Sequence, residues 1–252
     1  MLSPSNCARV CCVRLRDGAP CVFSARPQRV INCFNNVIGL SLPEEIGTLT
    51  ELTEVNFAAN KLAMLKDTHF ASWSKVTVLN LNDNNLATLG SFAPLVALEE
   101  LRLYGNQLTA LPTLPSDCPI RILEAHKNRL ADLSDDYFAA TPALERLSIW
   151  GNQLTTLPNS LTKCASLVGV QCQTNPELKC LPEGPWPATL ETLFLQETKL
   201  GALPASLKKC DLKRVNLTGV ACDDELAKQL ESLVLSKPGA IFWDKSGKQT
   251  RN

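Results

Sequence analysis

The sequence lacks several features that would assign it to a common class of protein. Its 25 basic and 25 acidic residues give a formal net charge of zero, so it has no basic excess of the kind that neutralises nucleic-acid phosphates. No apolar run approaches the roughly 18 residues that a membrane span needs. Residues 1–20 contain no basic segment followed by an apolar one, so we expect no signal peptide. These absences predict a cytoplasmic protein that binds no nucleic acid and crosses no membrane.

The residues that usually carry catalysis are also scarce. The sequence has no glycine-rich phosphate loop, no set of metal ligands and no nucleophile with an orienting third group. His126 lies two residues from Glu124, but no third group completes an acid–base site. We therefore expect no enzyme activity, no cofactor and no metal.

Cysteine, in contrast, is abundant, with eleven residues. Because we expect no signal peptide, we predict reduced thiols rather than a disulfide framework. Cys33 and Cys172 occupy positions where the repeat described below has leucine, and a free cysteine behaves as a small buried hydrophobe. Four N-terminal cysteines lack paired C-x2-C spacing and a nearby histidine, which favours an apolar cap over a zinc site. These four are Cys7, Cys11, Cys12 and Cys21.

One pattern recurs along the chain. Fifteen residues, LEELRLYGNQLTALP at 98–112, return in nearly the same form as LERLSIWGNQLTTLP at 144–158. The underlying L-x-x-L-x-L-x-x-N-x-L pattern is weaker at 167–177 and degraded at 28–38 and 212–222. Its asparagines are spaced 22 to 24 residues apart. They are Asn36, Asn60, Asn84, Asn106, Asn128, Asn152 and Asn175, and Thr198 and Val220 continue the register.

This pattern resembles the leucine-rich repeat family in its short subtypes of about 22–24 residues, over about residues 28–222. The resemblance implies an α/β leucine-rich repeat solenoid with a curved parallel β-sheet on the concave face. Its convex side would mix helical, 3₁₀ and extended segments, and a cap would close each end. The period differs from the longer repeats of ribonuclease-inhibitor and GTPase-activating relatives, which argues against both functions.

The spacing also has a physical reason of its own. Apolar residues at the first, fourth and sixth positions suit a short strand with one buried face. The asparagine turns out of the strand, where its amide can bond unpaired backbone groups of neighbouring turns. Segments 69–76 and 136–144 can hold a helical turn. Segments 111–119 and 184–190 are richer in proline and should be extended or 3₁₀.

The sequence divides into four segments. We predict an N-terminal cap at 1–27, containing a β-hairpin around Asp17-Gly18. Residues 28–221 should form about nine leucine-rich repeats. A helical cap should follow at 222–243, because an open end of the solenoid exposes the stacked leucines of its last repeat. Asp223 or Asp224 is the predicted N-cap of this helix. Residues 244–252 are predicted to be a flexible tail.

The candidate site lies in a position that the pattern leaves free, two residues before each asparagine. Tyr104, His126 and Trp150 occupy it in three consecutive repeats, and strands about 4.8 Å apart would align the rings in a strip roughly 10 Å long. Aromatic residues and arginine are enriched at binding hot spots. The alternative is that the rings lie flat against one another and shield the stacked leucine side chains of the repeats. With residues of the neighbouring column, the predicted protein-binding residues are Arg102, Tyr104, Glu124, His126, Trp150 and Phe194.

We therefore predict a non-catalytic module, monomeric on its own, that binds a protein partner through its concave face. A stiff curved sheet presents side chains with little ordering cost on binding. The resemblance leaves more specific roles open: a regulatory or targeting subunit of a phosphatase or cytoskeletal motor, or a bacterial-effector-like repeat domain. A structural spacer within a larger assembly is a further alternative.

Overall fold

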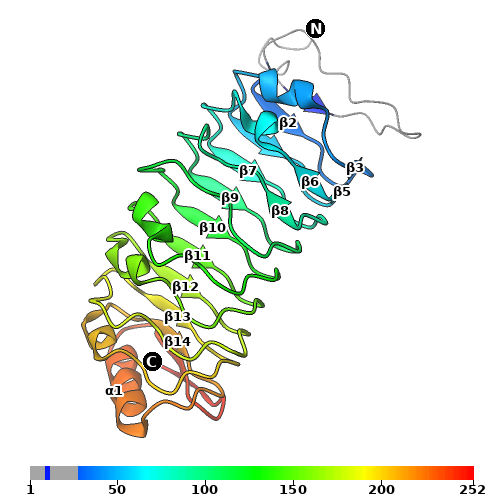
Figure 1. Ribbon diagram of the computed structural model, residues 1–252. Coiled ribbons are helices and arrows are strands. Elements are labelled where there is room, and N and C mark those ends of the chain that lie inside the picture. Colours follow the sequence, from blue (N-terminus) through cyan, green and yellow to red (C-terminus); the bar gives the residue numbers. More distant parts are fainter. Residues whose placement is uncertain (1–8, 12–27) are drawn as a thin grey trace, which may run out of the picture.

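The computed structural model describes residues 9–11 and 28–252, and within them a 12-stranded sheet forms the spine of the molecule. Figure 1 shows its strands stacked in chain order from the N-terminal to the C-terminal end. Every neighbouring pair is parallel except the last. The predicted solenoid with a parallel sheet is therefore confirmed. In spatial order the strands are β1 (Arg9–Cys11), β2 (Val30–Asn32), β4 (Glu54–Asn56), β7 (Val78–Asn80), β9 (Glu100–Arg102), β10 (Ile122–Glu124), β11 (Arg146–Ser148), β12 (Gly169–Gln171), β13 (Thr192–Phe194), β14 (Arg214–Asn216), β15 (Ile241–Trp243) and β16 (Gln249–Arg251).

The side chains of each repeat strand alternate between the core and the open face. Leu101, Leu123 and Leu147 are the middle residues of β9, β10 and β11, pair in register and are buried. Equivalent residues continue the apolar core from Ile31 to Phe242. Because successive side chains of a strand point to opposite faces, the first and third residues of each strand project from the concave side.

The return segments on the other side contain short 3₁₀ helices and two small strand pairs. Pro43, Pro158 and Pro204 are the N-caps of three of these helices. Proline suits the start of a helix because its φ is fixed and it has no N–H group to leave unpaired. The helices are η2 (Glu44–Thr48), η3 (Asp67–Phe70), η4 (Tyr137–Ala140), η5 (Asn159–Lys163) and η6 (Ala205–Lys209). The short strands are β3 (Gly39–Leu40) with β5 (Lys61–Leu62), and β6 (Met64–Leu65) with β8 (Thr88–Leu89).

The predicted character of the return segments agrees with these positions. The helix η4 lies inside 136–144, and η3 overlaps the start of 69–76. The proline-rich segments 111–119 and 184–190 contain no helix. No helix in the described part of the chain has the length and apolar character needed to cross a membrane.

The repeated asparagines join one repeat to the next through the backbone. At Asn128, the amide nitrogen donates to the carbonyl oxygens of Leu103 and Ala125, each at 3.0 Å. Its Oδ1 accepts from the backbone N–H of Leu108 at 3.0 Å. Thr198, at the equivalent position farther along, donates only to Leu195 of its own repeat. The architectural role predicted for these asparagines is confirmed, although their amides bond backbone groups rather than each other.

A left-handed residue precedes each buried asparagine of this ladder. Gly105 and Gly151 adopt φ values of 66° and 63°, which glycine does without steric conflict. Thr174 holds the same position at φ 53°, a conformation that is unfavourable for a β-branched residue. The geometry of the repeat therefore imposes a left-handed backbone on Thr174, although threonine disfavours it.

The C-terminal end differs from its prediction. The helix α1 (Asp224–Leu235) has Asp223 as its N-cap, as the sequence predicts. Residues 244–252, however, are not a flexible tail, because β16 pairs antiparallel with β15. The Asp244 carboxylate accepts from the N–H groups of Ser246 and Lys248 and stabilises the turn. The returning strand covers the edge that β15 would otherwise expose.

At the N-terminal end, β1 pairs parallel with β2. The predicted turn at Asp17-Gly18, the second hairpin strand and three of the four N-terminal cysteines (Cys7, Cys12 and Cys21) lie outside the described residues. Cys33 is disulfide-bonded, so the prediction of reduced thiols is wrong at this position. The cysteines found as free thiols are Cys118, Cys164, Cys172, Cys180, Cys210 and Cys222.

Candidate functional site

Three aromatic rings form a stack along one side of the concave face. The ring centroids of Tyr104 and His126 are 4.4 Å apart with an interplanar angle of 7°. Those of His126 and Trp150 are 4.6 Å apart at 11°. All three side chains are half-buried. The rings therefore lie flat against one another and still expose their edges, so both interpretations of the strip keep a structural basis.

The stack is uncharged at neutral pH. Burial, and secondly the charge of Lys127, lower the pKa of His126 to about 4. Its Nδ1 lies 3.1 Å from the Ser148 hydroxyl oxygen. Burial is also the main cause of a raised pKa at Tyr104. The ammonium of Lys127 lies 5.0 Å from the centroid of the Trp150 ring, within the range of a cation–π contact.

Arg102 and Glu124 lie together beside this stack. The Arg102 Nη2 is 2.6 Å from Glu100 Oε2, and its Nε is 3.4 Å from Glu124 Oε2. Two carboxylates thus neutralise this guanidinium. The Glu124 carboxylate is thus paired with Arg102, and the His126 ring is paired with Ser148.

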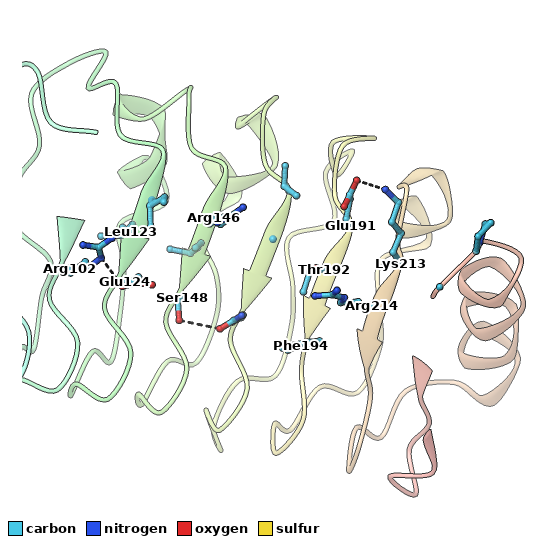
Figure 2. Close-up of a pocket in the computed structure, with 17 residues that line it drawn as sticks. Arg102, Leu123, Glu124, Arg146, Ser148, Glu191, Thr192, Phe194, Lys213 and Arg214 are labelled. Carbon is cyan, nitrogen blue, oxygen red and sulfur yellow. Dashed lines mark hydrogen bonds and ion pairs between the residues drawn. The ribbon is translucent and has the colours of Figure 1, made fainter. Parts of the chain in front are cut away.

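A groove of about 820 Å³ opens in the concave face next to the ring stack. Figure 2 shows side chains that line it, from Arg102 on β9 toward the C-terminal end. Pro238 and Gly239, after α1, close that end. The predicted site residues thus fall into two groups: Arg102, Glu124 and Phe194 line the groove, whereas the three stacked rings do not.

The centre of the groove is hollow because Gly169 has no side chain. By strand register, Arg146, Gly169, Thr192 and Arg214 form one row across four strands. A Cβ added at Gly169 would meet only the Thr192 Cβ, at 3.7 Å, which is an ordinary contact. The space above β12 is therefore available to a ligand rather than filled by backbone.

Sequence reasoning missed this row: Arg146, Gly169, Thr192 and Arg214 are not among the site residues that it selected. It also missed Trp243, whose ring is 6.1 Å from that of Phe194 in an edge-to-face arrangement. A signal was present for the row, because each of its four residues occupies a concave position that the repeat pattern leaves free. Trp243 lies on β15, beyond the predicted repeats, so the pattern gave no signal for it.

Comparison with known families agrees with this architecture. The family described as leucine rich repeat matches residues 50–108, and a second leucine rich repeat description matches residues 143–164. The chain contains leucine-rich repeats. A comparison with curated protein sequences gives no match.

Solved leucine-rich repeat structures are similar in fold. A leucine-rich repeat protein of Leptospira interrogans aligns with a TM-score of 0.70 and 22% identity, over 82% of this chain and 53% of that chain. YopM of Yersinia enterocolitica aligns at 0.61 and 23%, over 77% and 38%. A chain of the octameric latrophilin 3, Unc5D and FLRT2 complex, in which FLRT2 contributes leucine-rich repeats, aligns at 0.57 and 23%, over 81% and 72%. The chain thus spans about half the length of the Leptospira protein. At these identities the likeness concerns the fold alone.

Proposed function

We propose that this leucine-rich repeat protein is a non-catalytic module that binds a protein partner through its concave face. The observation that carries the proposal is the stack of Tyr104, His126 and Trp150 beside an open groove. The leucine-rich repeat fold supports protein interaction in general, and one similar chain comes from a multi-protein complex. A regulatory or targeting subunit is the more specific form of the proposal, and a structural spacer is its alternative.

The stack suits recognition because its order exists before a partner arrives. Each ring is held by its neighbours, so binding need not immobilise three free side chains. Stacked aromatic rings offer a large apolar area, and Tyr104 and Trp150 add polar edges. Since His126 is neutral, a partner that covers the strip does not have to remove water from a charged imidazolium ring.

The test compares capture of a partner by matched variants. The chain would be immobilised and exposed to extract of its own cells, with Trp150→Ala as the concave variant. Met64→Ala is the control, because Met64 is an exposed apolar residue on β6, outside the main sheet. We expect Trp150→Ala to lose a partner that wild type and Met64→Ala retain. Equal retention of the same partner by both variants would refute the concave site.

A further inference from the structure

Two arginines face the hollow centre of the groove without an acidic partner. Arg146 on β11 and Arg214 on β14 form no ion pair within the described ranges, 9–11 and 28–252. Both side chains line the groove, and Figure 2 shows Arg214 extending beside Thr192 of the neighbouring strand. They are separated by two strands whose residues in this row are Gly169 and Thr192. In this row, therefore, no side chain lies between Arg146 and Thr192 of β13.

The neighbouring charges differ because they are neutralised. Lys213 is paired with Glu191 and lies 3.3 Å from Asp211, and Arg102 is paired with Glu124. Cations outnumber acids among the lining residues by four to two. The unneutralised positive charge of the groove thus belongs to the two arginines of the central row.

The row has the dimensions of a site for one anionic group. Three strand spacings of about 4.8 Å separate the two arginine backbones by roughly 14 Å. Two long side chains that extend inward across this distance converge on a space between them. Thr192 lies between the arginines in the same row and offers a hydroxyl donor beside this space.

We propose that the groove binds a phosphorylated side chain of a partner peptide, held between Arg146 and Arg214 above Gly169. A phosphoryl group carries about −1.5 to −2 charges at neutral pH, which matches two guanidiniums, whereas a carboxylate carries one. Arginine also donates paired hydrogen bonds to phosphate oxygens. The inference rests on the proposed recognition of a protein by the concave face and names the chemistry of that protein.

The rest of the groove suits an extended peptide. It crosses six strands from β9 to β14, a span of roughly 24 Å, or about seven extended residues. Phe194 lies two residues after Thr192 on β13, and its ring contacts Trp243. Two residues of an extended peptide that crosses the strands advance by roughly 7 Å, about one and a half strand spacings, and share one face of the peptide. An apolar side chain two residues from a phosphorylated one above β12 would therefore lie over β13 and β14, beside this aromatic pair.

The test uses fluorescein-labelled peptides of seven residues in a fluorescence polarisation titration. The probe contains one central phosphoserine and a phenylalanine two residues later, and matched peptides contain serine or glutamate instead of phosphoserine. We expect the phosphoserine peptide to bind best. Arg146→Gln and Arg214→Gln should each weaken it about tenfold or more, the loss of a charge-assisted contact. Gly169→Leu should block binding by filling the hollow.

The controls separate a site from general attraction. Arg129 is an exposed arginine outside the groove, so Arg129→Gln should leave the affinity unchanged. The proposal is overturned if no peptide binds, if the glutamate peptide binds as well as the phosphoserine one, or if Arg129→Gln weakens binding as much as Arg146→Gln. If the peptides fail while partner capture still depends on Trp150, only this inference falls. If capture is also insensitive to Trp150→Ala, the proposed function falls with it.

Discussion

Leu147 and Trp150 lie three residues apart but serve opposite sides of the sheet. Leu147 is the middle residue of β11, 1% exposed, and pairs in register with Leu123 and Val170. Trp150 is half-buried, with one ring neighbour, His126, and a lysine ammonium nearby. Truncating each residue to alanine should therefore separate the architecture of the repeat from its exposed surface.

The two truncations should differ in magnitude. Leu147→Ala removes a fully buried leucine from a close-packed core, which costs about 2–5 kcal/mol. Trp150→Ala loses one aromatic contact of about 0.5–1.5 kcal/mol and one exposed cation–π contact of about 0.5–1 kcal/mol. Its free energy of unfolding should thus fall by about 1–2.5 kcal/mol, at or below the lower end of the range for the leucine variant. Partner binding should instead weaken by about 2 kcal/mol or more, as at a hot spot.

Urea unfolding of the two variants measures the difference, with the midpoint and the slope fitted separately. An unchanged slope would show that both variants unfold as cooperatively as the wild type. If Trp150→Ala destabilises the protein as much as Leu147→Ala, the ring belongs to the core. The stack would then be architecture, and the concave hot spot would lose its main support.

Three further outcomes follow from the structure. In an NMR titration the His126 ring should protonate near pH 4, and a titration midpoint near pH 6.5 would contradict the buried stack. Because the unfolded chain takes up this proton near pH 6.5, the free energy of unfolding should fall as the pH drops from 6.5 toward 4. Thr174→Gly should raise the urea midpoint, since left-handed backbone costs about 1–2 kcal/mol and glycine entropy about 0.5–1 kcal/mol; a lower midpoint would refute this balance. Removing residues 222–252 bares the edge of β14 and should cause aggregation or a clear loss of thermal stability, whereas a monomer with unchanged Tm would show that the segment is not a cap.

The sequence predicts the sheet because each repeat imposes the same requirement at the same position. Leucines at 98, 101 and 103 must be buried together, and Asn106 must meet backbone groups of its neighbours. Once that register is known, consecutive repeats place Tyr104 beside His126. The order of the rings could therefore be predicted, whereas their flat stacking could be named only as one of two alternatives, because it depends on side-chain rotamers.

The groove could not be predicted in the same way. Its centre belongs to the weak copy at 167–177, and it exists because Gly169 contributes no side chain. The sequence positions of the concave residues also do not show which charged side chains pair. Arg102 forms ion pairs with two carboxylates, whereas Arg146 forms none within the described chain. The tail was mistaken for a flexible end because a short strand without a repeat pattern, here β16, is recognisable only once β15 supplies its partner.

Site-specific photo-crosslinking tests the concave assignment most directly. Benzoylphenylalanine would replace Gln171, which lines the groove, and in a second variant Ala139, an exposed residue of η4 on the opposite side. Both variants would be irradiated in extract of the native cells. Our account predicts a covalent adduct with one protein from position 171 and none from position 139. An adduct with that protein from position 139 alone would contradict it.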